Sequence, residues 1–123
     1  MKNRNTKLSK VNVVIIDDDK IFTDSLAAYV QMKNEKLVVD KYYHAAKFLE
    51  NSSLYDKDTK FVIDFDLKNN INGIELASQL YNAGYTKIYL LSGRDFKKGK
   101  YPSYIKALLK GDMIGLDKLI AQW

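Results

Sequence analysis

The chain contains no cysteine and only one histidine among its 123 residues. Disulfide frameworks, thiolate zinc sites, iron–sulfur clusters and cysteine nucleophiles are therefore excluded. The single histidine, His44, rules out a histidine-rich metal site, and we expect it at the surface or at a helix start. No apolar run reaches the roughly 18 residues of a membrane span, and no signal-peptide core follows the basic N-terminus. A cytoplasmic protein without a membrane partner is the expectation.

Positive charge is unevenly distributed along the chain, whose formal net charge is +5. Residues 1–10 hold four basic and no acidic residues, and residues 94–110 hold six basic residues and one acidic residue. The rest of the chain is therefore net acidic. A net positive charge by itself suggests nucleic acid, but neither a helix-turn-helix nor an aromatic stacking platform accompanies it. Direct nucleic-acid binding is consequently the weakest interpretation.

The sequence divides into a short arm and one domain. Residues 1–10 are polar and basic without hydrophobic periodicity, which predicts a flexible arm. Residues 11–123 have the length of one ordinary domain, and the 46% apolar content of the chain suffices for a core.

Short runs rich in β-branched and other apolar residues alternate with segments of helical periodicity along this domain. Strands are expected over residues 13–16, 37–42, 61–63, 88–91 and 107–109, the second of them at a sheet edge. Helices are expected over residues 22–30, 45–49, 74–81 and 116–123, with Asn72 and Glu75 as a capping box and Asp112 as a cap. This order predicts an α/β fold with three layers, a doubly wound (βα)5 chain around a five-stranded parallel sheet. Residues 93–106 have a poor helical pattern, so the fourth helix should be short or irregular.

Polar side chains stand where the predicted strands end. Asp17 and Asp18 follow the first strand, Asp64 the third, Ser92 the fourth and Lys110 the fifth. Carboxyl ends of parallel strands share one edge of the sheet, where ligands bind, so these side chains should converge. Clustered carboxylates repel one another unless a cation neutralises them or one of them takes a proton, and oxygen ligands alone favour a hard ion such as Mg²⁺. An aspartate in such a site is able to act as a nucleophile and form an aspartyl phosphate.

Five short motifs on these elements resemble the receiver domain of bacterial two-component response regulators, over essentially all of Val11 to Trp123. They are Val13-Val14-Ile15-Ile16-Asp17-Asp18, Phe61-Val62-Ile63-Asp64-Phe65-Asp66-Leu67, Asn72-Gly73-Ile74-Glu75-Leu76, Leu90-Leu91-Ser92-Gly93 and Leu108-Leu109-Lys110-Gly111-Asp112. The resemblance implies the flavodoxin-like strand order 2-1-3-4-5.

The resemblance also implies a role for each matching residue. Asp64 would be the phosphoacceptor, preferred over Asp66. Ser92 and Lys110 would bind the phosphoryl group, with Lys110 preferred over Lys106. The implied Mg²⁺ ligands are Asp17, Asp18, Asp64 and the backbone carbonyl of Asp66.

The function that the resemblance implies is phosphotransfer signalling. A histidine kinase or a histidine phosphotransfer protein would phosphorylate the chain, which would then change its affinity for a downstream protein target. Beyond this self-phosphotransfer and autodephosphorylation, no enzymatic activity is expected. With no output domain after Trp123, the chain would be a stand-alone receiver or a piece of a larger protein.

Two alternatives stay open. Ala107 stands where the family often carries an aromatic switch residue, and the fourth helix is degraded, so an unphosphorylated pseudo-receiver interaction module is one of them. The other is a phosphatase of the haloacid-dehalogenase type, whose Asp-x-Asp motif resembles Asp64-Phe65-Asp66. Those enzymes usually place this motif on their first strand and need a longer chain.

Overall fold

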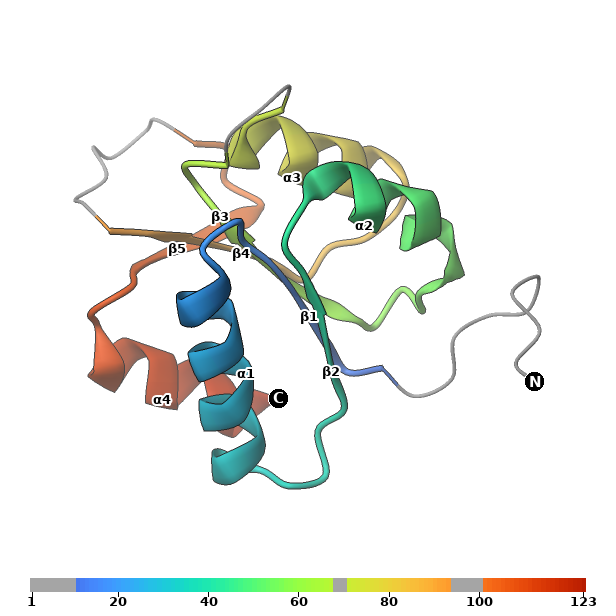
Figure 1. The fold of residues 1–123 in the computed structure, drawn as a ribbon. Coiled ribbons are helices and arrows are strands. Elements are labelled where there is room, and N and C mark those ends of the chain that lie inside the picture. The colour runs from blue at the N-terminus through green and yellow to red at the C-terminus, as the bar shows by residue number, and fades with distance from the viewer. Residues whose placement is uncertain (1–10, 68–70, 94–100) are drawn as a thin grey trace.

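The fold is a five-stranded parallel sheet with helices on both faces (Figure 1). It is seen in a computed structural model that describes residues 11–67, 71–93 and 101–123. The sheet order is β2-β1-β3-β4-β5, which confirms the expected α/β fold and its strand order. The strands are β1 (Val13–Ile16), β2 (Val39–Tyr42), β3 (Lys60–Asp64), β4 (Ile88–Ser92) and β5 (Ile105–Leu109). The α-helices of the described ranges are α1 (Lys20–Lys33), α2 (Ala45–Asn51), α3 (Gly73–Asn82) and α4 (Met113–Gln122), and a 3₁₀ turn spans Ser52–Leu54.

The core lies on both faces of the sheet because alternate residues of each strand point to opposite sides. Val14 and Ile16 of β1 pack with α2 and α3, whereas Val13 and Ile15 pack with α1 and α4. Both sides of β1 are paired, by β2 and by β3, and all four of its residues are buried. This explains why a continuous β-branched run, without polar alternation, forms this strand.

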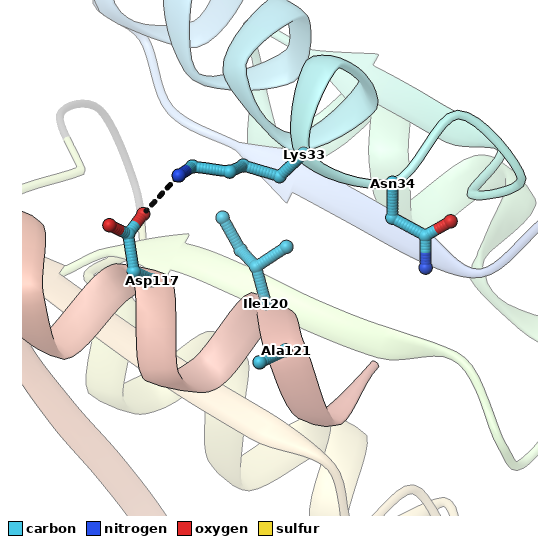
Figure 2. A pocket seen from close by; sticks show the side chains of 5 residues that line it. All are labelled: Lys33, Asn34, Asp117, Ile120 and Ala121. Carbon is cyan, nitrogen blue, oxygen red and sulfur yellow. Dashed lines mark ion pairs between the residues drawn. The ribbon is translucent and has the colours of Figure 1, made fainter.

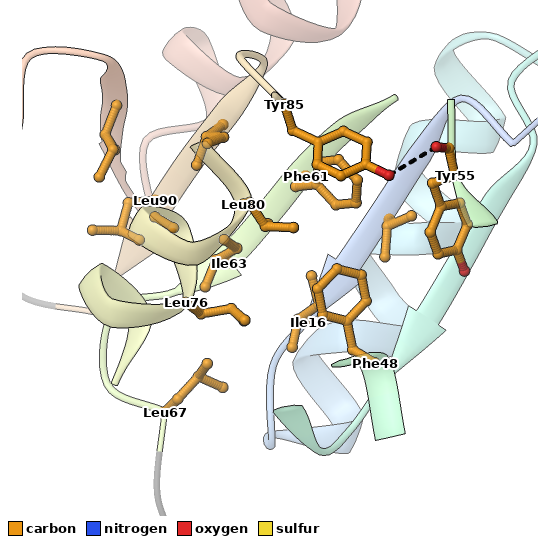
Figure 3. Packing of buried hydrophobic residues seen from close by; sticks show 14 residues of the cluster. Ile16, Phe48, Tyr55, Phe61, Ile63, Leu67, Leu76, Leu80, Tyr85 and Leu90 are labelled. Atoms are coloured by element: carbon orange, nitrogen blue, oxygen red, sulfur yellow. Dashed lines mark hydrogen bonds between the residues drawn. The ribbon is translucent and has the colours of Figure 1, made fainter. Parts of the chain in front are cut away.

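Aromatic rings fill much of the face beneath α2 and α3 (Figure 3). Phe61 of β3 makes edge-to-face contacts with Phe48, Tyr55 and Tyr85, at centroid distances of 5.6, 6.0 and 4.9 Å. The buried hydroxyl of Tyr85 donates to the carbonyl oxygen of Tyr55 at 2.8 Å, so its polar end is satisfied. These rings hold β3, and hence its terminal Asp64, against the helices.

Element boundaries differ from expectation at two strands. The strand expected from residue 37 begins at Val39. Leu37 belongs instead to the turn after α1, because its N–H donates to the carbonyl oxygen of Asn34. As expected, β2 is an edge strand. At the other edge, β5 begins at Ile105, two residues before the expected start, because Ile105 and Lys106 pair with β4.

Between β4 and β5, the described residues 93 and 101–104 contain no helix. The rest of the segment expected to hold a short or irregular fourth helix, residues 94–100, lies outside the described residues. So does the expected basic arm, residues 1–10. None of the helices in the described ranges is long and apolar enough to cross a membrane.

The two helices on the second face are tied together near the end of α1 (Figure 2). Lys33 Nζ lies 3.6 Å from Asp117 Oδ1, and the Tyr29 hydroxyl donates to the same carboxylate. Lys33 and Asp117 border a surface cavity of about 330 Å³ that is lined also by Asn34 and Ile120. The contacts fix α1 against α4, and the opposite ends of both helices face the carboxyl edge of the sheet.

Candidate functional site

Three aspartates and one lysine meet at the carboxyl edge of the sheet. One carboxylate oxygen from each of Asp17, Asp18 and Asp64 lies within 4.8 Å of the others. Lys110 Nζ lies 2.8 Å from Asp17 Oδ2 and 3.4 Å from Asp64 Oδ1. Residues from the ends of β1, β3 and β5 therefore converge, as the parallel topology predicts.

The loop after β1 holds Asp17 rigidly. Asp17 is a buried residue, only 2% exposed. Its N–H donates to the carbonyl oxygen of Tyr42, and its Oδ1 accepts the N–H of Asp19 at 2.9 Å. Asp19 in turn caps α1 by accepting the N–H of Phe22 at 3.0 Å. Asp19 is therefore the N-cap of α1.

Asp64 ends β3 and is 6% exposed. Its Oδ1 accepts the N–H of Asp66 at 3.2 Å. The N–H of Phe65 donates to the carbonyl oxygen of Leu91 on β4 at 2.8 Å, which extends the sheet pairing by one hydrogen bond. The backbone thus leaves the sheet just after Asp64, and the Asp64 carboxylate points toward Lys110.

Gly73, at the start of α3, packs directly on this turn. A Cβ at Gly73 would lie 2.3 Å from the Asp64 carbonyl oxygen and 2.9 Å from Phe65 Cα, so only glycine fits without a backbone shift. The expected capping box is present beside it, since Asn72 and Glu75 each accept the other's backbone N–H. The spacing of Asn72 and Glu75 predicts the cap, but it does not predict the packing role of Gly73. Its place at the first helical position, close to Asp64 in the chain, is the sequence feature that could have indicated this packing role.

Ser92 and Lys110 lie side by side at the carboxyl ends of the neighbouring strands β4 and β5. Ser92 ends β4 and is buried, and its carbonyl oxygen accepts the N–H of Lys110 at 2.7 Å. This backbone bond fixes where the lysine side chain begins. Lys106, the competing lysine, is exposed earlier on β5.

Burial and neighbouring charge act on the two ionisable partners in opposite ways. Burial and the charge of Asp17 raise the pKa of Asp64 to about 6, against the lowering effect of Lys110. Burial would lower the pKa of Lys110, but its contacts with Asp17 and Asp64 outweigh burial and raise that pKa. The lysine therefore stays cationic at neutral pH while the carboxylates repel each other.

The donor set fits a magnesium ion. Three carboxylates crowd together with a single ammonium between two of them, so the cluster carries excess negative charge, and all its donors are oxygen. The Asp66 side chain is exposed and is not a member of this group, which suits a role through its backbone carbonyl. His44 is exposed and directly precedes α2, as expected of a surface or cap residue.

Two neighbours of the site were not expected from the sequence. The Phe22 ring centroid lies 4.4 Å from Lys110 Nζ, and the Thr23 hydroxyl binds the carbonyl oxygen of Asp17 at 3.0 Å. Sequence periodicity placed Phe22 on the core face of its helix. Its closeness to the Asp17-Asp18-Asp19 run was the available signal.

No protein-family model matches the sequence, and no curated protein is significantly similar to it. Solved structures are similar in fold. The signal receiver domain of a DNA-binding response regulator from Colwellia psychrerythraea 34H is 18% identical, with a TM-score of 0.68 over 91% of this chain and 96% of that one. A response regulator receiver protein from Sinorhizobium medicae WSM419 is 17% identical, with a TM-score of 0.73 over 94% and 95%.

A response regulator receiver domain protein from Bacillus halodurans gives a TM-score of 0.68 at 14% identity, over 93% of this chain and 97% of that one. These similarities span nearly all of each chain, in agreement with the observed strand order. The chain has the fold of response regulator receiver domains.

Proposed function

We propose that this chain is a phosphoacceptor receiver whose Asp64 takes a phosphoryl group from the phosphohistidine of a kinase or a phosphotransfer protein. The observation that carries the proposal is the buried Asp64 carboxylate beside Asp17, Asp18 and the Lys110 ammonium, at the ligand-binding edge of a receiver fold. A domain that served only as a scaffold would gain nothing from burying mutually repelling carboxylates.

The transfer exchanges one bond to phosphorus for another. A carboxylate oxygen of Asp64 forms the new P–O bond as the P–N bond to the donor imidazole breaks, and the electron pair of that bond returns to the imidazole nitrogen. Negative charge on the phosphoryl oxygens must be balanced throughout. Mg²⁺, held by Asp17, Asp18, Asp64 and the carbonyl of Asp66, would supply part of this charge balance when bound.

Lys110 and Ser92 supply the remaining polar contacts in this proposal. The ammonium of Lys110, already beside Asp64, neutralises the acceptor before transfer and a phosphoryl oxygen after it. The Ser92 hydroxyl, at the end of β4, donates to another phosphoryl oxygen. The phosphorylated state then changes the affinity for a downstream protein in the cytoplasm.

Phosphorylation by a small donor tests the proposal. The protein with Mg²⁺ and acetyl phosphate should gain one phosphoryl group, seen by intact mass and removed by hydroxylamine, because an acyl phosphate is labile to that nucleophile. Asp64→Asn should abolish the adduct, and the matched Asp66→Asn variant should retain it.

Three other outcomes reassign the function or the acceptor. A folded protein that forms no adduct with Mg²⁺ is the pseudo-receiver interaction module. An adduct that survives Asp64→Asn refutes Asp64 as the acceptor. Repeated turnover of a phosphomonoester that depends on both Asp64 and Asp66 would instead mark a phosphatase, a reading that the exposed Asp66 side chain does not favour.

A further inference from the structure

The Lys110 ammonium contacts an aromatic ring in addition to two carboxylates. Its Nζ lies 2.8 Å from Asp17 Oδ2, 3.4 Å from Asp64 Oδ1 and 4.4 Å from the ring centroid of Phe22. The face of an aromatic ring carries partial negative charge and attracts a cation within about 6 Å of the centroid. The ammonium is therefore held by two carboxylates and by the ring.

The backbone around Phe22 is firmly placed. Phe22 is the third residue of α1, and its N–H donates to the capping carboxylate of Asp19 at 3.0 Å. The next residue, Thr23, is fully buried, and its hydroxyl binds the carbonyl oxygens of Asp17 and Asp19 at 3.0 and 2.7 Å. Long side chains in helices lean toward the helix N-terminus, which here directs the ring over the site.

We propose that Phe22 is a positioning residue that acts through Lys110. Lysine has a flexible four-carbon side chain, and its ammonium must exchange contacts with carboxylates for contacts with a phosphoryl group during the proposed transfer. Attraction to a ring face has no single preferred hydrogen-bond direction, so the ring keeps the ammonium near Asp64 while its polar partners change. The effect on phosphorylation rests on the proposed function, whereas the placement of Lys110 does not.

An apolar cavity beside the ring supplies matched variants. About 200 Å³ of space is lined by Phe22, Leu26, Met113 and Leu116 together with Lys110. Phe22→Leu keeps an apolar side chain and removes the ring face. Phe22→Trp keeps a ring face, and its larger indole has space beside it. Met113→Leu alters the lining of the same cavity and leaves Phe22 intact.

The first measurement follows Lys110 without metal or phosphodonor. A proton over a ring face is shifted upfield, so the ε-methylene signal of Lys110 in ¹³C-lysine-labelled protein should be shifted upfield in the wild type. The signal is assigned by its loss in Lys110→Arg. Phe22→Leu should move it toward the position of exposed lysines, whereas Phe22→Trp and Met113→Leu should leave it upfield.

The second measurement is the rate of phosphorylation by acetyl phosphate with Mg²⁺. Phe22→Leu should slow it about 3- to 10-fold, the range expected for the loss of one cation–ring contact. Phe22→Trp should restore most of the rate, which a purely structural role for Phe22 would not predict. Met113→Leu should react like the wild type.

The two measurements separate the possible failures. An unchanged Lys110 signal in folded Phe22→Leu overturns the positioning role, and so does a wild-type rate in that variant. A rate as slow in Phe22→Trp as in Phe22→Leu overturns it as well. If the wild type forms no adduct, the proposed function fails while the Lys110 signal still decides the placement. If Phe22→Leu does not fold, Phe22→Met replaces it under the same criteria.

Discussion

Asp64 is a carboxylate in a position that disfavours its charge. Burial and the charge of Asp17 raise its pKa to about 6, above the 3.8 of an unperturbed aspartate, although Lys110 opposes this. The folded state therefore binds a proton more tightly than the unfolded state does. The resulting stabilisation is present at low pH and is lost as the pH rises through about 6.

A pH series tests this charge effect at a single residue. In metal-free protein, raising the pH from about 4 to about 7 should lower the free energy of unfolding of the wild type relative to Asp64→Asn by about 1–2 kcal/mol. The comparison uses urea denaturation of both proteins in EDTA. Parallel pH profiles for the two proteins would contradict the raised pKa.

Lys110 offsets the charges of two buried carboxylates, so the stability of the fold should depend on its ammonium group. Lys110→Met leaves Asp17 and Asp64 without this cation, so the free energy of unfolding without metal should fall by about 2–4 kcal/mol. Added Mg²⁺ should recover part of the loss. Lys106→Met, at an exposed position of the preceding strand β5, is the control and should change stability little. An equal loss of unfolding free energy in both variants would contradict this role of Lys110.

At the scale of elements, the start of α3 determines how closely the helix approaches the turn after β3. The capping box of Asn72 and Glu75 sets where the helix begins, and Gly73 allows that first turn to contact the Asp64 backbone. The position of Asp64 thus depends on a helix terminus as well as on its own strand.

Adding one methyl group at this contact should disturb the site. Gly73→Ala places Cβ 2.3 Å from the Asp64 carbonyl oxygen, so we expect a loss of about 1–3 kcal/mol in the free energy of unfolding and slower phosphorylation. Gly93→Ala is the control, because nothing lies within 4 Å of a Cβ there, and it should change stability by less than about 0.5 kcal/mol. Chemical denaturation and the acetyl phosphate assay measure both effects. Identical behaviour of the two variants would argue against the close approach.

At the scale of the whole molecule, the sheet gathers charge from distant parts of the chain. Four strands lie side by side in the order β1-β3-β4-β5, and their carboxyl ends carry Asp17, Asp64, Ser92 and Lys110. The folded state therefore gathers an acidic cluster that the unfolded chain lacks, so a cation bound there as proposed should stabilise the fold by mass action.

Thermal unfolding with Mg²⁺ measures this coupling. The melting temperature of the wild type should rise with Mg²⁺, corresponding to about 2.7 kcal/mol once the ion reaches a hundred times its dissociation constant. Asp18→Asn should shift the response to higher Mg²⁺, because one carboxylate of the cluster is lost. Asp19→Asn keeps the helix cap and should respond like the wild type. A response unaffected by Asp18→Asn would place the ion elsewhere.

Much of the fold and of the candidate site is predictable from short patterns. The apolar run Val13–Ile16 predicts a buried central strand, and the strand-end positions of Asp17, Asp64 and Lys110 predict their convergence. Boundaries at the sheet edges were less predictable. The start of β2 at Val39 depends on the turn that Leu37 closes. An apolar residue such as Leu37 is compatible with the turn and with the strand, so the sequence pattern does not distinguish them.

The sequence by itself determined the order of strands and helices along the chain, the helix caps and the polar residues at the strand ends. Each of these depends on neighbours a few positions away, whose hydrophobic spacing and capping chemistry are local. Only the tertiary structure decided that the Phe22 ring meets Lys110, that Gly73 touches the Asp64 backbone, and that Lys110 lies closer to Asp17 than to Asp64. Those contacts join residues from different elements, and their distances follow from strand register and helix packing, which no local pattern encodes.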